Sequence, residues 1–291
     1  MLFRSVRLQR VELAKGAGVI TGNAWLSWAR SAFSVVADSD GVPVEAIDAF
    51  RVDRARLTGV LRNFKARGSG TLDRPLWQVD GYVPDLYVGD EGIGALSGRL
   101  QLAGNVLTLQ ELRARSDRLQ VGCAGTITLD DGYTAAANCQ FMHTSLDPYF
   151  KFVGRELPFN RVIASGSFDI VGPIADTPHL SVAARIDDAS LSFSGYQIRN
   201  DGPVELAFAD NTFRLSRVRF QGEDTRLALS GEANVTARTF DMAASGQASL
   251  GVLQAFYPSI SASGGATLTA RLSGTFDKPM LTGRADLSNG R

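Results

Sequence analysis

The stretch Gly98–Leu129, GRLQLAGNVLTLQELRARSDRLQVGCAGTITL, alternates apolar and polar residues with a period of two. Leu100 and Leu102 alternate with polar residues, and after a short break Leu107 and Leu109 do the same. Successive side chains of a β-strand point to opposite faces, so each run has one apolar and one polar face. The stretch therefore predicts a sheet with one side in water.

The breaks between these runs contain turn-forming residues, namely Gly104-Asn105, Ser116-Asp117 and Asp130-Asp131-Gly132. No stretch of helical periodicity separates the runs. Short turns between amphipathic strands favour an antiparallel meander over a series of βαβ units. We therefore predict an all-β fold.

The same design returns later in the chain. Asn105–Leu109 matches Asn211–Leu215, 106 positions on, and at the same offset Gly125 falls on Gly231. A weaker copy opens the chain at Val11–Leu13. A long period of this kind is typical of repeats that stack in one direction.

Three segments of a different kind recur about every 100 residues, and each could form two turns of helix: 44–50, 146–153 and 250–257. Each precedes a glycine-rich strand and a turn that contains proline. We predict short helices between β-repeats that span residues 1–70, 71–172 and 173–291. The last copy stops in mid-repeat without a cap, so we expect either a fragment of a longer protein or edges that pair with something.

Composition excludes several classes of function. The 291 residues are 44% hydrophobic and have 30 basic and 30 acidic side chains, and this zero net charge argues against nucleic-acid binding. No apolar stretch is long enough for a membrane helix. Neither His143 nor His179 has partners at metal-ligand spacing, and no catalytic or cofactor-binding pattern occurs. We predict a protein without enzymatic activity, metal or cofactor.

The two cysteines form a candidate pair. If Asp130-Asp131-Gly132 is a three-residue hairpin loop with its glycine in the left-handed conformation, Leu129 pairs with Tyr133 and Cys123 lies opposite Cys139. A cross-strand disulfide is then a candidate in an oxidising compartment. The alternative is a pair of small buried thiols, which is favoured because directly opposed cysteines often make strained bridges.

Three stretches of the sequence resemble the TamB and AsmA-like family of envelope proteins of diderm bacteria, which includes the translocation and assembly module. They are Ser97–Gly125, the weaker copy Pro203–Gly231, and LSGTFDKPMLTGRADLSNG at Leu272–Gly290. The resemblance lies in the pattern of the repeats and covers most of the chain.

This resemblance implies an elongated, curved antiparallel sheet, the β-taco or β-groove, with an apolar inside. It also implies a periplasmic location and an inner-membrane anchor in a segment that this chain does not contain. The implied role is the movement of phospholipid between inner and outer membranes, or help in outer-membrane protein assembly. An Omp85-type partner would bind through regions outside this chain.

The apolar positions of the strands would then line a lipid groove. They are Leu100, Leu102, Leu107, Leu109, Leu119, Val121, Ile127, Leu129, Leu206, Phe208, Phe213, Leu215, Phe220, Leu227, Leu229 and Val235. The same alternation also occurs in an ordinary packed core. The alternative function is a structural or interaction module, such as an adhesin-like β-sandwich or β-solenoid.

Overall fold

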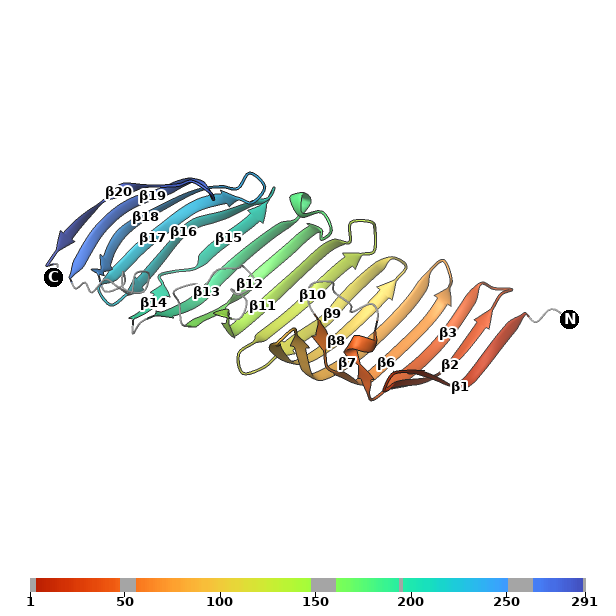
Figure 1. The fold of residues 1–291 in the computed structure, drawn as a ribbon. Helices are drawn as coiled ribbons and strands as arrows, with labels where there is room; N and C mark the ends of the chain where they lie inside the picture. Colours follow the sequence, from red (N-terminus) through yellow and green to blue (C-terminus); the bar gives the residue numbers. More distant parts are fainter. Residues whose placement is uncertain (1–3, 48–55, 148–160, 194–195, 251–263, 290–291) are drawn as a thin grey trace. The chain divides into compact units, whose positions relative to one another are not determined.

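The structure is a computed structural model that describes residues 4–47, 56–147, 161–193, 196–250 and 264–289 (Figure 1). It is 77% strand and 3% helix, and its strands form one large antiparallel sheet. The prediction of an all-β antiparallel fold is confirmed. The chain divides into two compact units, Met1–Cys139 and Gln140–Arg291.

The first unit is a meander in which neighbouring strands pair in chain order. Pairing runs from β1 through β2, β3, β6, β7, β8 and β9 to β10, always antiparallel. The short β4 pairs with β6 and the short β5 with β7. Their bounds are β1 Ser5–Lys15, β2 Gly18–Ser27, β3 Ala32–Ser39, β4 Val42–Pro43, β5 Leu57–Thr58, β6 Val60–Thr71, β7 Pro75–Val88, β8 Glu91–Ala103, β9 Val106–Arg115 and β10 Gln120–Thr128. The strand β11, Thr134–Ser145, contains the boundary between the units.

The strands of the second unit are also paired antiparallel, and at one place a strand pairs with two successive strands along the same edge. β12 pairs with β13, and β13 pairs with both β14 and β15, which in turn pair with β16. From β16 to β20 the strands again pair in chain order. Their bounds are β12 Arg161–Pro173, β13 Ser181–Phe193, β14 Tyr196–Asn200, β15 Val204–Ala209, β16 Thr212–Gly222, β17 Thr225–Asn234, β18 Thr239–Ser249, β19 Gly265–Thr275 and β20 Pro279–Ser288.

A β-bulge recurs at equivalent places in the repeats. In β9 two residues lie between Leu109 and Leu112 where β10 has one, and the same occurs in β16 between Leu215 and Val218. The 106-residue offset maps one bulge onto the other. Because a bulge adds a residue to one strand only, it reverses the facing of every residue beyond it. It therefore keeps Leu112 and Val218 on the apolar side despite their odd spacing.

The predicted helices are only partly within the described residues. At the first site the structure has a single 3₁₀ turn, Val44–Ala46, and another such turn occurs elsewhere, at Thr177–His179. Residues 48–50, 148–153 and 251–257 of the three predicted helices lie outside the described part of the chain.

The turn at Val44–Ala46 covers one end of the first unit's sheet. Val44 is buried together with Val83 and Leu86, and four partly buried residues pack against this cluster: Leu57, Leu61, Ile93 and Leu96. This is the local hydrophobic core of the first unit.

Candidate functional site: an apolar sheet face

Strand register aligns apolar residues of the first unit into rows on one side of the sheet. One row, in strand order from β2 to β10, is Ala24, Val35, Gly68, Trp77, Leu102, Leu107 and Ile127. The next is Gly22, Ala37, Ala66, Val79, Leu100, Leu109 and Gly125. We call these two rows the first apolar face.

An aromatic pair lies on this face. The ring centroids of Phe33 in β3 and Trp77 in β7 are 5.5 Å apart, and β6 lies between these strands. The indole of Trp77 lies across Gly68 of β6, so that a Cβ at Gly68 would be 2.5 Å from Cζ3 of Trp77. Glycine is needed here to leave room for the ring.

The second unit has an equivalent surface. One row, in strand order, is Phe168, Ala184, Leu206, Leu215, Gly231, Met242, Leu272 and Leu281. The next is Ile170, Val182, Phe208, Phe213, Ala233, Phe240, Gly274 and Pro279. We call these rows the second apolar face.

Parts of the second apolar face are open to solvent. Phe208 is 9% exposed, but Phe213, whose ring centroid lies 4.6 Å from that of Phe208, is 54% exposed. Leu281 in β20 is 71% exposed. Large apolar side chains in rows at this exposure are unusual for a packed core and typical of a binding surface.

The opposite side of the sheet is charged. In the first unit, the strand register places five charged residues in one row, and the sign of the charge alternates along it: Asp38, Lys65, Asp80, Arg99 and Glu111. Nε of Arg99 lies 2.9 Å from Asp80, and this hydrogen bond raises the pKa of Arg99.

In the second unit Arg271 pairs with Asp241, which lowers the pKa of that carboxyl. Arg214 of the same side pairs with Glu232 at 3.5 Å. Each unit thus has one charged and one apolar side.

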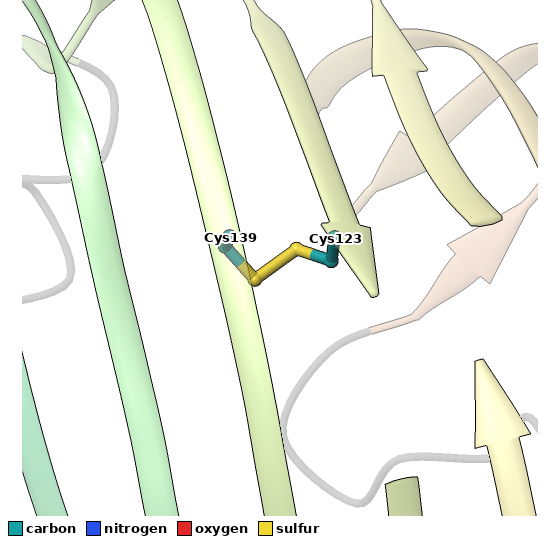
Figure 2. Close-up of a disulfide and its surroundings, with 2 residues drawn as sticks. All are labelled: Cys123 and Cys139. Atoms are coloured by element: carbon teal, nitrogen blue, oxygen red, sulfur yellow. A yellow bond between two sulfur atoms is a disulfide. The ribbon is translucent and has the colours of Figure 1, made fainter. Parts of the chain in front are cut away.

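Cys123 and Cys139 are joined in a disulfide between β10 and β11, with their Cα atoms 4.1 Å apart (Figure 2). The expectation that favoured free thiols is therefore wrong for this structure. The short Cα separation is close to that of a non-hydrogen-bonded antiparallel pair, about 4.5 Å, in which facing side chains come closest. Cys139 is buried.

The hairpin before β11 differs in detail from the prediction. Tyr133, with φ 51°, is the left-handed residue, and Gly132 is not. The carboxylate of Asp130 accepts hydrogen bonds from the backbone N–H and the hydroxyl of Thr134, at 3.0 and 2.8 Å, and these bonds lower the pKa of Asp130. The loop conformation therefore depends on an aspartate side chain, which can replace backbone bonds in a turn.

The remaining predicted lining residues lie as follows. Val121 is opposite Ala114, Phe220 is opposite Leu227, and Leu229 is opposite Val218. Leu119 is buried just before β10. Leu129 and Val235 lie just beyond β10 and β17, where their N–H groups donate to the carbonyls of Asn105 and Asn211.

Sequence reasoning missed the contributions of β2, β3, β6, β7, β12, β13 and β18 to β20. In β7, glycine and apolar residues on both sides obscure the alternation, and in β18 the apolar side continues beyond Phe240 and Met242 only as Ala244, Gly246 and Ala248. If these strands had been aligned with neighbouring strands whose alternation is clear, the residues could have been identified.

Within the described residues, no group of three or more His, Cys, Asp or Glu could hold a metal ion. None of the helices in that part of the chain is long and apolar enough to span a membrane. No protein-family model matches the chain, and comparisons with curated proteins and with solved structures found no significant similarity.

Proposed function

We propose that this chain belongs to a non-enzymatic cell-envelope protein whose apolar β-groove carries or shields lipid between the inner and outer membranes, or assists outer-membrane protein assembly. The observation that supports the proposal is the pair of apolar faces, each backed by a charged side, with leucine and phenylalanine side chains exposed on the second of them. On this proposal the sheet curves into a groove around the acyl chains of a phospholipid.

Acyl chains are suited to such a face. Each CH₂ group that leaves water for an apolar surface contributes about 0.8 kcal/mol, without any specific polar contact. A lipid could therefore move along rows of leucine, phenylalanine and small residues without a fixed site. Helical segments or polar pockets are not required.

The disulfide supports a location in the periplasm. Bonds of this kind form and persist in oxidising compartments and are rare in the cytosol. An inner-membrane anchor and contact with an Omp85-type partner would then depend on regions outside this chain.

A photo-crosslinking experiment tests the proposal. A photoreactive amino acid at Leu109 or Phe213 is on an apolar face, whereas its neighbours Gln110 and Arg214 provide matched positions directed away from it. The purified chain is incubated with vesicles of phosphatidylethanolamine and phosphatidylglycerol, irradiated, and examined by mass spectrometry.

We expect phospholipid adducts at Leu109 and Phe213 and few at Gln110 and Arg214. If all four positions crosslink only to the chain itself, the face is covered by protein, and the proposal fails in favour of an interaction module. Equal adducts at all four positions would indicate non-specific lipid contact and would also contradict it.

A further inference from the structure

Three turns recur at a fixed interval and share an unusual backbone conformation. Each follows a glycine, and the three glycines lie 102 residues apart: Gly70, Gly172 and Gly274. Their φ angles are 114°, 117° and 111°, and a Cβ on any of them would lie 2.5–2.6 Å from a carbonyl oxygen across the turn. Only glycine fits such a position. We call these turns, residues 70–75, 172–179 and 274–279, the glycine turns.

The backbone of the first and third glycine turns is held by the same bonds. The N–H of Arg74 donates to the carbonyl and the hydroxyl of Thr71, both at 3.2 Å. The N–H of Lys278 donates in the same way to Thr275, at 3.1 Å. The glycine and the threonine therefore define the conformation, and the three side chains that follow are not needed for it. These are an apolar residue, an acid and a base: Leu72-Asp73-Arg74 and Phe276-Asp277-Lys278.

The apolar residue of each glycine turn is exposed: Leu72 at 62%, Ile174 at 49% and Phe276 at 43%. The N–H groups of Leu72 and Phe276 donate to the carbonyls of Ser31 and Arg238, so the strand ladder continues to both residues. Strand alternation then places both side chains on the apolar side of the sheet. The ring centroid of Phe276 lies 5.8 Å from that of Phe240, which belongs to the second apolar face. That face therefore continues into the third glycine turn.

Turns at the opposite ends of the strands have a different composition. Four of them consist only of glycine, alanine and acidic residues: Gly16-Ala17, Asp40-Gly41, Gly89-Asp90 and Glu223-Asp224. Turns in general favour small and polar residues. The formation of a turn therefore does not explain the leucine, isoleucine and phenylalanine of the glycine turns.

Charged residues lie next to these apolar side chains. In the first glycine turn an acid and a base directly follow the leucine. In the second, Asp176 lies 2.7 Å from Nδ1 of His179. In the third, Arg238 contacts Asp277 at 3.0 Å, and its guanidinium lies over the phenylalanine ring, 5.9 Å from the centroid. Each glycine turn thus presents an acid, a base and a large apolar side chain at one exposed place.

We infer that the glycine turns bind the headgroup of a zwitterionic phospholipid whose acyl chains lie on the adjoining apolar face. The inference rests on the proposed function and adds a headgroup site to it. Acyl chains need no polar contact, but the phosphodiester and the ammonium of the headgroup keep their charges and cannot enter an apolar groove unpaired. At a glycine turn the base pairs with the phosphodiester and the acid with the ammonium, through charge-assisted hydrogen bonds. The apolar residue contacts the first methylene groups of the chains.

Binding of short-chain lipids to the full chain tests the inference by isothermal titration calorimetry. Dihexanoyl phosphatidylethanolamine and dihexanoyl phosphatidylglycerol are compared with dihexanoylglycerol, which has the chains without the phosphate. Glycerophosphoethanolamine and inorganic phosphate supply the headgroup chemistry without the chains. We expect the phosphatidylethanolamine to bind most tightly. The two chain-free compounds should bind far more weakly, because the acyl chains contribute most of the binding free energy.

Removal of the bases locates the phosphodiester. The triple variant R74Q/H179Q/K278Q should weaken binding of dihexanoyl phosphatidylethanolamine about threefold, an effect in the range of exposed ion pairs. The matched control removes three bases from the charged side of the strands and should leave binding unchanged: K65Q/R185Q/R214Q. Circular dichroism confirms that each variant is folded.

Removal of the acids locates the ammonium. The triple variant D73N/D176N/D277N should also weaken binding of the phosphatidylethanolamine about threefold. It should not weaken binding of the phosphatidylglycerol, whose headgroup has no ammonium. Equal effects on the two lipids would contradict the assignment of the acids.

The outcomes separate this inference from the proposed function. If dihexanoylglycerol binds but the phosphatidylethanolamine binds no more tightly, or if turn and control variants behave alike, the headgroup site is refuted and the apolar groove stands. If inorganic phosphate binds as tightly as the lipid, the turns are a site for free phosphate, which also overturns the inference. If no compound with acyl chains binds, the proposed function fails and the inference fails with it.

Discussion

At the scale of single residues, Gly68 has a role that hydrophobicity alone does not reveal. The Trp77 ring covers it, so Gly68→Ala would force the indole or the strand to move. We expect a loss of about 1–3 kcal/mol in the free energy of unfolding, measured by urea denaturation. Gly98→Ala is the matched control on the same side of the sheet, because its Cβ would lie 3.4 Å from Cδ1 of Leu112, an ordinary contact. An equal effect at both glycines would contradict this explanation.

The disulfide closes a loop between residues 16 positions apart. Replacing Cys123 and Cys139 together by serine should lower the free energy of unfolding by about 3 kcal/mol, because the unfolded chain regains the entropy of that loop. Wild type unfolded in reducing buffer should match the double variant. Identical urea midpoints for oxidised and reduced wild type would show that the bridge adds no stability.

At the residue scale, the sequence correctly predicted that the two cysteines lie opposite each other, but it favoured free thiols where the structure has a disulfide. Counting residues through the Asp130 hairpin places Cys123 opposite Cys139, and the structure has them adjacent. The preference for free thiols failed because the actual Cα separation could not be known from the count. Tyr133, and not Gly132, adopts the left-handed conformation, because hydrogen bonds to the Asp130 side chain hold the loop.

At the scale of strands, the β9 bulge makes a specific prediction about deletions. Removing Gln110 should leave one residue opposite Ala124 and keep Leu109 and Leu112 on the apolar side, so the protein should fold with little loss of stability. Removing Thr108 instead should turn Leu107 to the charged side and shorten the turn before it, at a cost of about 2 kcal/mol.

Thermal unfolding followed by circular dichroism compares the two deletions. A protein destabilised more by loss of Gln110 than by loss of Thr108 would mean that the curvature from the bulge matters more than the facing of the leucines.

The contact between β18 and β19 predicts a pH dependence. The hydrogen bond from Arg271 lowers the pKa of Asp241 in the folded chain below its unfolded value near 3.9. The contribution of this contact to stability is therefore complete above the unfolded pKa and is lost as pH falls through the folded pKa. Asp241→Asn should lower the melting temperature at neutral pH, and the difference from wild type should shrink in acid. A difference that stays constant from neutral to acidic pH would contradict this assignment.

Strand positions were predictable from sequence where leucine alternates with polar residues, as in β9 and β16. The bulges were visible only as a three-residue step, Leu109 to Leu112 and Leu215 to Val218, which sequence alone does not distinguish from a break between strands. Strands such as β18, in which Ala244, Gly246 and Ala248 follow Phe240 and Met242 on the apolar side, were missed because small residues give a weak periodic signal.

At the scale of the whole chain, the zero net charge does not reveal that one side of the sheet carries charged side chains and the other side apolar ones. Ion pairs such as Arg99–Asp80 and Arg271–Asp241 neutralise the charged side locally. On the second apolar face, by contrast, Phe213 and Leu281 remain exposed. Composition could not predict this, because it depends on which residues share a side after each bulge.

Adjacent residues of β20 offer a test of that separation. Leu281 and Met280 are 71% and 58% exposed, but Leu281 continues a row with Leu272 and Met242, whereas Met280 lies on the other side beside Ser273. Leu281→Asp interrupts a continuous apolar surface, and Met280→Asp removes an isolated apolar group. Both variants add the same charge, but the Leu281→Asp variant should elute clearly earlier from a hydrophobic-interaction column than the Met280→Asp variant. The melting temperatures of both variants should stay close to that of the wild type. If the two variants elute together, the two sides do not differ in accessible apolar surface, and the physical basis for a lipid-binding face is lost.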